Sequence, residues 1–167
     1  MSQTSPTNKF VPCLWFDGRA QEAMEFYTSV FKDSKKAGFT YYGDKGPGTK
    51  GQVMTASFTL FGQEFLALNG GPMYQFTPAI SLMVNCEDQA EIDYYWDKLT
   101  ADGGEAVMCG WLKDKFGVSW QIIPKDLSEM MQSGTQAQRE RMMAAVMQMK
   151  KLDAAAMRRA FRGTEAA

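Results

Sequence analysis

The sequence of 167 residues contains no histidine. Histidine is the commonest general base near neutral pH and the commonest protein ligand for zinc and non-haem iron. Its absence excludes Ser-His-Asp and Cys-His nucleophile systems, because each of them needs an imidazole to accept the proton of the nucleophile. Acid–base chemistry in this chain therefore has to come from carboxylates or other groups.

Cysteine and excess charge are also scarce. The three cysteines, Cys13, Cys86 and Cys109, are odd in number and too widely spaced for a disulfide framework or a CxxC metal motif. We therefore expect reduced thiols and a cytoplasmic protein. The net charge of −1 and the pI near 5.5 provide no field that attracts nucleic acid or an anionic membrane, so neither is expected as a partner.

Long apolar runs are absent as well. No run approaches the roughly 18 residues of a membrane span, and the polar start MSQTSPTNK lacks the apolar centre of a signal peptide. We expect residues 1–9 to be a flexible N-terminal tail and the chain to have no membrane partner.

A duplicated pattern organises the chain between residues 10 and 124. Each copy begins with a short apolar strand, at residues 14–16 and 82–84, and continues into a helix with apolar side chains three or four residues apart. Phe26-Tyr27 aligns with Tyr94-Tyr95, and each copy closes with a hairpin at a Phe-Gly pair. The pattern predicts an α+β fold of two strand-helix-three-strand (βαβββ) modules, which form a curved mixed sheet as a cup with the helices outside.

The first copy is longer because of a glycine-rich loop at residues 42–51. Gly43 and Gly48 have the spacing of a phosphate loop, but Thr49 precedes Lys50 where that motif needs Lys first. Nucleotide binding is therefore not expected. Two interpretations stay open: a lid beside a pocket, and a plain solvated connection.

The pattern changes after Pro124, and we expect residues 125–167 to form a C-terminal helical extension. Helices are predicted at residues 136–151 and 153–162, the second ending at Gly163. Methionines are frequent here and give an adaptable apolar surface. That surface either packs on this domain or a second copy, or docks a partner.

One run at the end of the second copy is specific. Residues 111–121 read WLKDKFGVSWQ. Together with the Phe-Tyr of the first helix and the duplication, this run resembles the PhnB-like branch of the vicinal-oxygen-chelate superfamily, the group of glyoxalase, bleomycin-resistance protein and extradiol dioxygenase. Members of the branch often carry the label 3-demethylubiquinone-9 3-methyltransferase. The resemblance covers residues 10–124 and implies eight strands in two βαβββ modules and, commonly, a homodimer.

The resemblance also implies four inward-facing positions that hold a metal in the metal-using relatives. Carried over, they are Pro12, Leu66, Ile80 and Gln121. Proline and two aliphatic side chains coordinate nothing, and a single neutral amide is a poor ligand. We therefore expect no metal and no cofactor.

Alternation along the strands extends this set into a predicted ligand cup. Leu14 and Phe16 are placed beside Pro12, Leu82 beside Ile80, and Ser119 beside Gln121. Such a cup is mostly apolar with few polar points, which suits a small hydrophobic or aromatic molecule. The alternative is that the cup is filled by its own side chains, with Gln121 bonded to backbone or water.

Candidates for catalysis are weaker, and they are Gln121, Glu64 and Asp114. Glu64 shares the face of Leu66 as a rim acid or base, Asp114 is able to orient the turn before Gly117, and Cys13 is expected to pack beneath the helix. The chain lacks the alternating βα succession of the common S-adenosylmethionine fold, so the methyltransferase label has no support in the residues. We expect a metal-free binding protein; the alternatives are a non-metal enzyme and a dimeric interaction protein that uses its Met-rich helices.

Overall fold

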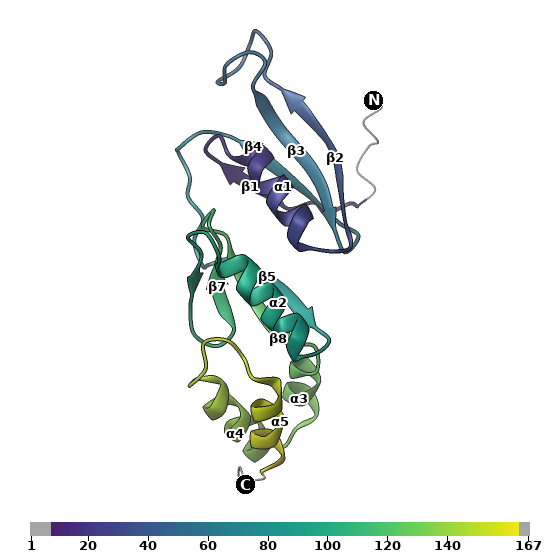
Figure 1. The fold of residues 1–167 in the computed structure, drawn as a ribbon, viewed down its shortest axis with the longest axis vertical. Helices are drawn as coiled ribbons and strands as arrows, with labels where there is room; N and C mark the ends of the chain where they lie inside the picture. The colour runs from purple at the N-terminus through teal and green to yellow at the C-terminus, as the bar shows by residue number, and fades with distance from the viewer. Residues whose placement is uncertain (1–7, 164–167) are drawn as a thin grey trace. The chain divides into compact units, whose positions relative to one another are not determined.

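A computed structural model describes residues 8–163, which form two compact units divided between Phe76 and Thr77 (Figure 1). The predicted N-terminal tail therefore lies mostly outside the described residues, as do residues 164–167 of the predicted extension. None of the helices within residues 8–163 combines the length and the apolar character that a membrane span requires.

The first unit is one βαβββ module. Its elements are β1 (Cys13–Phe16), α1 (Ala20–Val30), β2 (Ser34–Tyr41), β3 (Val53–Leu60) and β4 (Gln63–Asn69). They form one four-stranded sheet in the order β1-β4-β3-β2, in which β1 is parallel to β4 and the other pairs are antiparallel. The mixed sheet follows from the helix crossover between β1 and the rest of the module.

The second unit repeats this plan. It contains β5 (Leu82–Cys86), α2 (Gln89–Thr100), β6 (Glu105–Ala106), β7 (Trp111–Lys113) and β8 (Ser119–Pro124), ordered β5-β8-β7-β6. Again the first and last strands are parallel. The predicted α+β class and the duplication are confirmed as two four-stranded mixed sheets.

One face of each sheet is covered by the helix of its module. In the first unit, the ring of Tyr27 on α1 is fully buried and stacks on Phe58 with 6.0 Å between ring centroids, and Phe58 stacks on Phe65 at 5.5 Å. In the second unit, Tyr95 on α2 is buried in the same way, in edge-to-face contact with the ring of Tyr94. Each buried aromatic ring adds a large apolar area to its core, which explains the Phe-Tyr and Tyr-Tyr pairs in the sequence.

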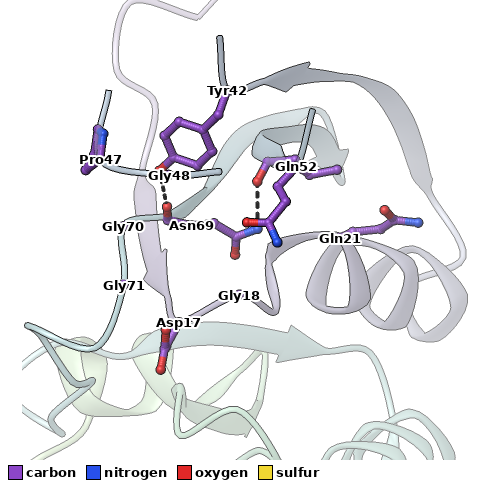
Figure 2. Close-up of a pocket in the computed structure, with 11 residues that line it drawn as sticks. Asp17, Gly18, Gln21, Tyr42, Pro47, Gly48, Gln52, Asn69, Gly70 and Gly71 are labelled. Atoms are coloured by element: carbon purple, nitrogen blue, oxygen red, sulfur yellow. Dashed lines mark hydrogen bonds between the residues drawn. The ribbon is translucent and has the colours of Figure 1, made fainter. Parts of the chain in front are cut away.

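The loop between β2 and β3 is fastened to the end of β4 through Asn69 (Figure 2). The hydroxyl of Tyr42 donates to the backbone carbonyl of Asn69, and the Asn69 amide donates to the carbonyl of Val53 at 3.0 Å. The side-chain oxygen of Asn69 accepts the N–H of Ala20 at 2.8 Å. One residue therefore joins the loop, the start of β3 and the start of α1.

The turn between β7 and β8 is organised by the carboxylate of Asp114, which is 1% exposed. One carboxylate oxygen accepts the backbone N–H groups of Phe116 at 2.9 Å and Val118 at 3.0 Å, and the other accepts the indole N–H of Trp120 at 2.8 Å. Gly117 has φ of 90°, a region that favours glycine. These contacts account for the Asp, Gly and second Trp of the WLKDKFGVSWQ run.

Three helices follow β8 and belong to the second compact unit. They are α3 (Leu127–Ser133), α4 (Gln136–Val146) and α5 (Ala154–Arg162). Helix α5 agrees with its prediction and ends at Gly163 with φ of 80°. The methionines of these helices are largely internal: Met130, Met142 and Met157 share a buried cluster with Ile123 of β8.

Helix α4 ends five residues before its predicted end at Lys151, where the N–H groups of Gln148 and Met149 donate to the carbonyls three residues back, of Ala145 and Val146, instead of four. The N–H groups of Cys109 and Gly110 donate to the carbonyls of Met149 at 2.7 Å and Lys150 at 2.8 Å. These carbonyls are therefore bonded outside the helix. Leu152 then packs over Gly110, where a Cβ atom would lie 3.1 Å from the leucine side chain.

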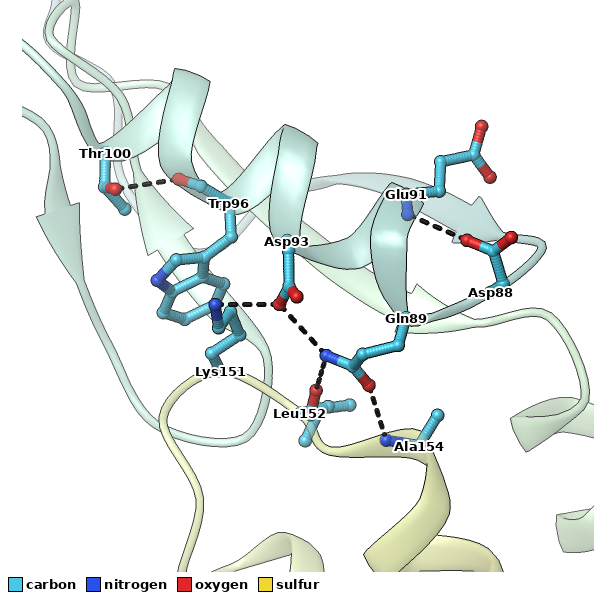
Figure 3. Close-up of polar contacts among 9 residues, drawn as sticks. All are labelled: Asp88, Gln89, Glu91, Asp93, Trp96, Thr100, Lys151, Leu152 and Ala154. Atoms are coloured by element: carbon cyan, nitrogen blue, oxygen red, sulfur yellow. Dashed lines mark hydrogen bonds and ion pairs between the residues drawn. The ribbon is translucent and has the colours of Figure 1, made fainter.

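Polar contacts hold the segment before α5 against α2 (Figure 3). The amide of Gln89 donates to the carbonyl of Leu152 at 3.1 Å and accepts the N–H of Ala154 at 2.9 Å. Asp93 accepts from Gln89 at 3.1 Å and pairs with Lys151 at 2.7 Å. The hydrogen bond from Lys151 lowers the pKa of the Asp93 carboxyl. Sequence periodicity contains no signal for this connection.

A second ion pair joins α5 to the start of α3. The guanidinium of Arg158 donates to both carboxylate oxygens of Asp126, at 2.6 and 3.1 Å. Arg158 is the main cause of a lowered pKa at the Asp126 carboxyl. This two-pronged geometry is the stronger form of an Arg–carboxylate pair.

We predict that Asp114→Ala lowers the free energy of unfolding by about 2–4 kcal/mol, because it leaves buried N–H donors without an acceptor. Urea denaturation followed by circular dichroism measures the change. Asp97→Ala, at an exposed carboxylate of α2, is the control and should change stability by no more than about 0.5 kcal/mol. Equal effects of the two substitutions would contradict the structural role of Asp114.

We also predict that the stabilisation by the Arg158–Asp126 pair depends on pH. Because the pKa of Asp126 is lowered in the folded state, the pair stabilises the protein above the unfolded pKa of about 4, and this stabilisation is lost as the pH falls further. Arg158→Met should therefore cost about 0.5–1 kcal/mol at pH 7 and less in acid, measured by urea denaturation at each pH.

Arg159→Met removes the same charge at an exposed position of α5 and is the control for this pH dependence. A gap between the wild type and Arg158→Met that stays constant down to pH about 3 would show that the ion pair does not carry the effect.

Candidate functional site

The sheet of the first unit has one face away from α1, which we call the open face. The strand register defines it: Cys13 pairs with Leu66, and Leu66 pairs with Ser57. The neighbouring register row, Leu14 with Ala67 and Ala67 with Ala56, faces α1, where Ala56 and Ala67 are fully buried. Glu64 pairs with Thr59 and shares the open face with Leu66, as the sequence predicted.

The side chains of the first strand alternate one residue out of step with the prediction, so the residues expected on the open face lie on the other face. Leu14 and Phe16 lie on the α1 side, and Phe16 is buried against the ring of Phe76 at 5.2 Å between centroids. Pro12 precedes β1 and accepts the N–H of Leu66 through its carbonyl at 3.0 Å. Cys13, expected beneath the helix, is exposed on the open face instead. A shift of one residue moves every side chain of a strand to the other face, so all four expectations changed together.

The second unit shows the same shift in its first strand. Met83 pairs with Gln121, whereas Leu82 pairs with the buried Trp120 on the α2 side. Ile80 precedes β5 and is 71% exposed. The face of this sheet that points away from α2, which is its open face, therefore carries Met83 and Gln121 rather than Leu82.

Gln121 has a protein partner on the open face of the second sheet. Its amide donates to the hydroxyl of Ser81 at 2.9 Å. Ser119, two residues earlier on β8, is buried at 6% exposure. The partner explains how an amide is accommodated in the middle of an otherwise apolar strand.

A hollow of about 240 Å³ lies on the open face of the first sheet. Its apolar lining includes Val11, Ala37 and Leu66, and its polar lining includes Cys13, Ser57 and Glu64. One oxygen of Glu64 accepts the backbone N–H of Asn8 at 3.0 Å. The hollow brings together Leu66 of the predicted cup and Glu64, which was predicted as a rim acid or base.

Sequence reasoning missed part of this hollow. Ser57 and Ala37 come from strands that were not assigned to a face, and Cys13 was assigned to the wrong one. The alternation around Ala56, Phe58 and Leu60 of β3 was the available signal, because these buried residues leave Ser57 and Thr59 on the opposite face. The centre of the open face is therefore more hydroxyl-rich than expected.

Asp114 orders a turn in the second unit and is not part of either open face. Its two oxygens accept hydrogen bonds from the turn and from Trp120 inside the second unit. A buried carboxylate engaged in this way orders the turn, so its position supports the orienting role that was predicted for it rather than catalysis.

A larger hollow, of about 390 Å³, lies beneath the β2–β3 loop of the first unit (Figure 2). It is lined by Asp17 and Gln21 near the start of α1, by Tyr42 and Gln52 of the loop, and by Gly70 after β4. The loop thus covers a pocket, which was one of the two interpretations of residues 42–51.

The donor atoms on the open faces do not match a metal site. With the observed register, the paired open-face positions on the first and last strands of the two modules are occupied by Cys13, Leu66, Met83 and Gln121. Partial desolvation raises the pKa of the Cys13 thiol, which disfavours the thiolate that a metal needs. Among residues 8–163, no three side chains of the Cys, Asp and Glu types are grouped so that they would hold a metal ion.

Comparison with known proteins gives a consistent picture. The family model described as 3-demethylubiquinone-9 3-methyltransferase matches residues 8–123. A putative 3-demethylubiquinone-9 3-methyltransferase, a PhnB protein from Bacillus cereus, is 43% identical over 70% of this chain and 99% of its own, with a TM-score of 0.64. None of the curated proteins compared with the chain matches it.

More distant structures share the fold. Protein PA1353 from Pseudomonas aeruginosa is 22% identical over 68% of this chain and 95% of its own, with a TM-score of 0.56. The fosfomycin resistance protein FosX from Listeria monocytogenes, solved with Mn(II) and sulfate, is 13% identical over 77% of this chain and 98% of its own, with a TM-score of 0.53. At these identities the two structures show a shared fold. With the family match and the 43% identical relative, the chain belongs to the PhnB-like, 3-demethylubiquinone-9 3-methyltransferase family.

Proposed function

We propose that this PhnB-like protein binds a small, largely apolar or aromatic molecule, and that it does so without a catalytic metal. The observation that carries the proposal is the hollow of about 240 Å³ on the open face of the first sheet. A hollow of this size suits a ligand smaller than a typical drug molecule.

The lining supports an apolar ligand with one or two polar groups. Val11, Ala37 and Leu66 offer apolar surface, whose burial contributes about 25 cal/mol per Å². Ser57 and Glu64 offer a hydroxyl and a carboxylate at the same hollow, which fix the orientation of a ligand that carries a hydrogen-bond donor.

Binding is favoured over catalysis by the same side chains. Desolvation raises the pKa of Cys13, so its thiol is largely protonated and weakly nucleophilic at neutral pH. Gln121 is neutral and donates to Ser81. The enzyme alternative would leave Glu64 as the titratable acid or base of the hollow.

We infer that the methyltransferase name of the family does not describe a methyl transfer by this chain. Support comes from the architecture, since each unit has one helix on one face of a four-stranded mixed sheet. The common S-adenosylmethionine fold instead alternates strands and helices around a parallel sheet.

The interaction-protein alternative is less favoured because the C-terminal methionines are occupied. Met130, Met142 and Met157 lie in the buried cluster of the second unit, which leaves mainly Met131 and Met147 exposed in this segment. We therefore assign these helices a structural role.

The free state of all three cysteines supports a cytoplasmic location.

We predict that the protein is a homodimer, because large apolar side chains such as Phe10, Met73 and Met83 are more than half exposed. Sedimentation velocity at micromolar concentration should then give twice the chain mass of 18.7 kDa. A species of 18.7 kDa at all concentrations would contradict the dimer.

The binding proposal is tested with N-phenyl-1-naphthylamine, a neutral aromatic dye that brightens in apolar sites. Ser57→Trp places an indole in the hollow and should weaken dye binding at least about tenfold, measured by fluorescence titration. Lys36→Trp is the matched control, at an exposed residue of β2 outside the lining, and should bind as the wild type does.

Two outcomes would overturn the proposal. One is equal dye affinity of Ser57→Trp and the wild type, with circular dichroism showing that both are folded. The other is no saturable dye binding by the wild type together with native mass spectra that contain only ligand-free protein. Saturable binding that is lost in Ser57→Trp alone supports it.

A further inference from the structure

The hollow of about 390 Å³ beneath the β2–β3 loop shares no lining residue with the hollow of the open face. It falls in the size range of small-molecule pockets. All of its lining lies in the first unit, so its geometry depends on that unit alone.

The pocket has a fixed frame. The backbone of the loop is closed by hydrogen bonds of 2.9 Å from Tyr42 N–H to the carbonyl of Gln52, and from Gly51 N–H to the carbonyl of Tyr42. Asn69 uses both ends of its side chain to hold β3 and α1. A frame held from three sides loses little freedom when a ligand binds, and this favours affinity.

Two glycines bring backbone close to aromatic rings at this site. A Cβ atom on Gly48 would lie 2.3 Å from the ring of Tyr42, and one on Gly70 would lie 2.2 Å from the indole of Trp15. Glycine is therefore required for the observed packing at both positions. Because Gly48 has no side chain, its peptide groups can contribute hydrogen-bonding edges to the wall of the pocket, whereas the N–H of Gly70 already donates to the carbonyl of Phe16 at 3.0 Å.

The charges of the pocket disfavour an anion. No lysine or arginine belongs to its lining, and two cations close to it in the sequence are paired, Arg19 with Glu22 at 2.9 Å and Lys50 with Asp44 at 2.7 Å. Asp17 is the charged residue of the lining, and its carboxylate is turned away from Asn69 and Gln52 (Figure 2). A cation therefore gains little from it as well.

The remaining polar groups of the lining are neutral. The side chain of Asn69 and the hydroxyl of Tyr42 hold the frame, which leaves the amide of Gln52, the amide oxygen of Gln21 and the ring of Tyr42 for a ligand. Amides, peptide groups and an aromatic ring are complementary to hydroxyl groups on a carbon frame. We propose that this pocket is a second ligand site, for a small uncharged molecule rich in hydroxyl groups, such as a monosaccharide.

The test uses D-glucose as the neutral probe, with inorganic phosphate and ethanolamine as the anionic and cationic probes. Each is titrated to about 50 mM into the ¹⁵N-labelled full chain, and the amide signals of Gly48, Gly70 and Gly71 are followed by NMR. We expect glucose to shift these signals in a saturable manner, with the other two probes giving smaller shifts.

Two variants test whether the glucose-induced shifts come from binding at this pocket. Gln52→Ala should weaken glucose binding about fivefold, as expected for the loss of one neutral hydrogen bond. Gln75→Ala is the matched control, because Gln75 is exposed in the same unit and outside the lining, and its affinity should equal that of the wild type.

Several results would overturn this assignment. They are the absence of glucose shifts at these glycines, a stronger response to phosphate or ethanolamine, and equal glucose affinity of Gln52→Ala and the wild type. Because the dye experiment addresses other residues, failure of one proposal leaves the other standing.

Discussion

The parallel pairing of the first and last strands in each unit is the constraint on which the rest of the structure depends. Cys13 opposite Leu66, and Met83 opposite Gln121, decide which side chains face the helix and which face away from it. The helix crossover makes this pair parallel, and burial of the helix-side residues locks its register. That pairing determines the position of every candidate site residue on these strands.

The open faces of the two sheets carry different side chains. In the first unit, Ser57, Thr59 and Glu64 surround Leu66 and leave a hollow. In the second, the amide of Gln121 is bonded to Ser81, and the end of β8 is covered where Ile123 joins the methionine cluster. The C-terminal helices therefore complete the core of one unit only, which explains why the sequence repeats up to Pro124 and not beyond.

Much of the fold was predictable because it rests on periodicity. Apolar spacing identified both long module helices, and the duplication predicted the order of elements along the chain, strand, helix and three strands, in each module. The faces of β4 and β8 were also correct, since Glu64, Leu66 and Gln121 alternate with buried neighbours. The faces of β1 and β5 were not, because Leu14, Phe16 and Leu82 are apolar and equally suited to a cup or to a core.

The remaining features depend on contacts between residues far apart in the chain. The segment after α4 is held by the N–H groups of Cys109 and Gly110, which donate to the carbonyls of Met149 and Lys150, and no local propensity encodes that pairing. In the same way, the glycines of the β2–β3 loop left open whether it was a lid or a plain connection, and the hydroxyl of Tyr42, which donates to Asn69, holds the loop over a pocket. Local sequence thus sets which elements form, and these long-range hydrogen bonds determine where the fold leaves room for a ligand.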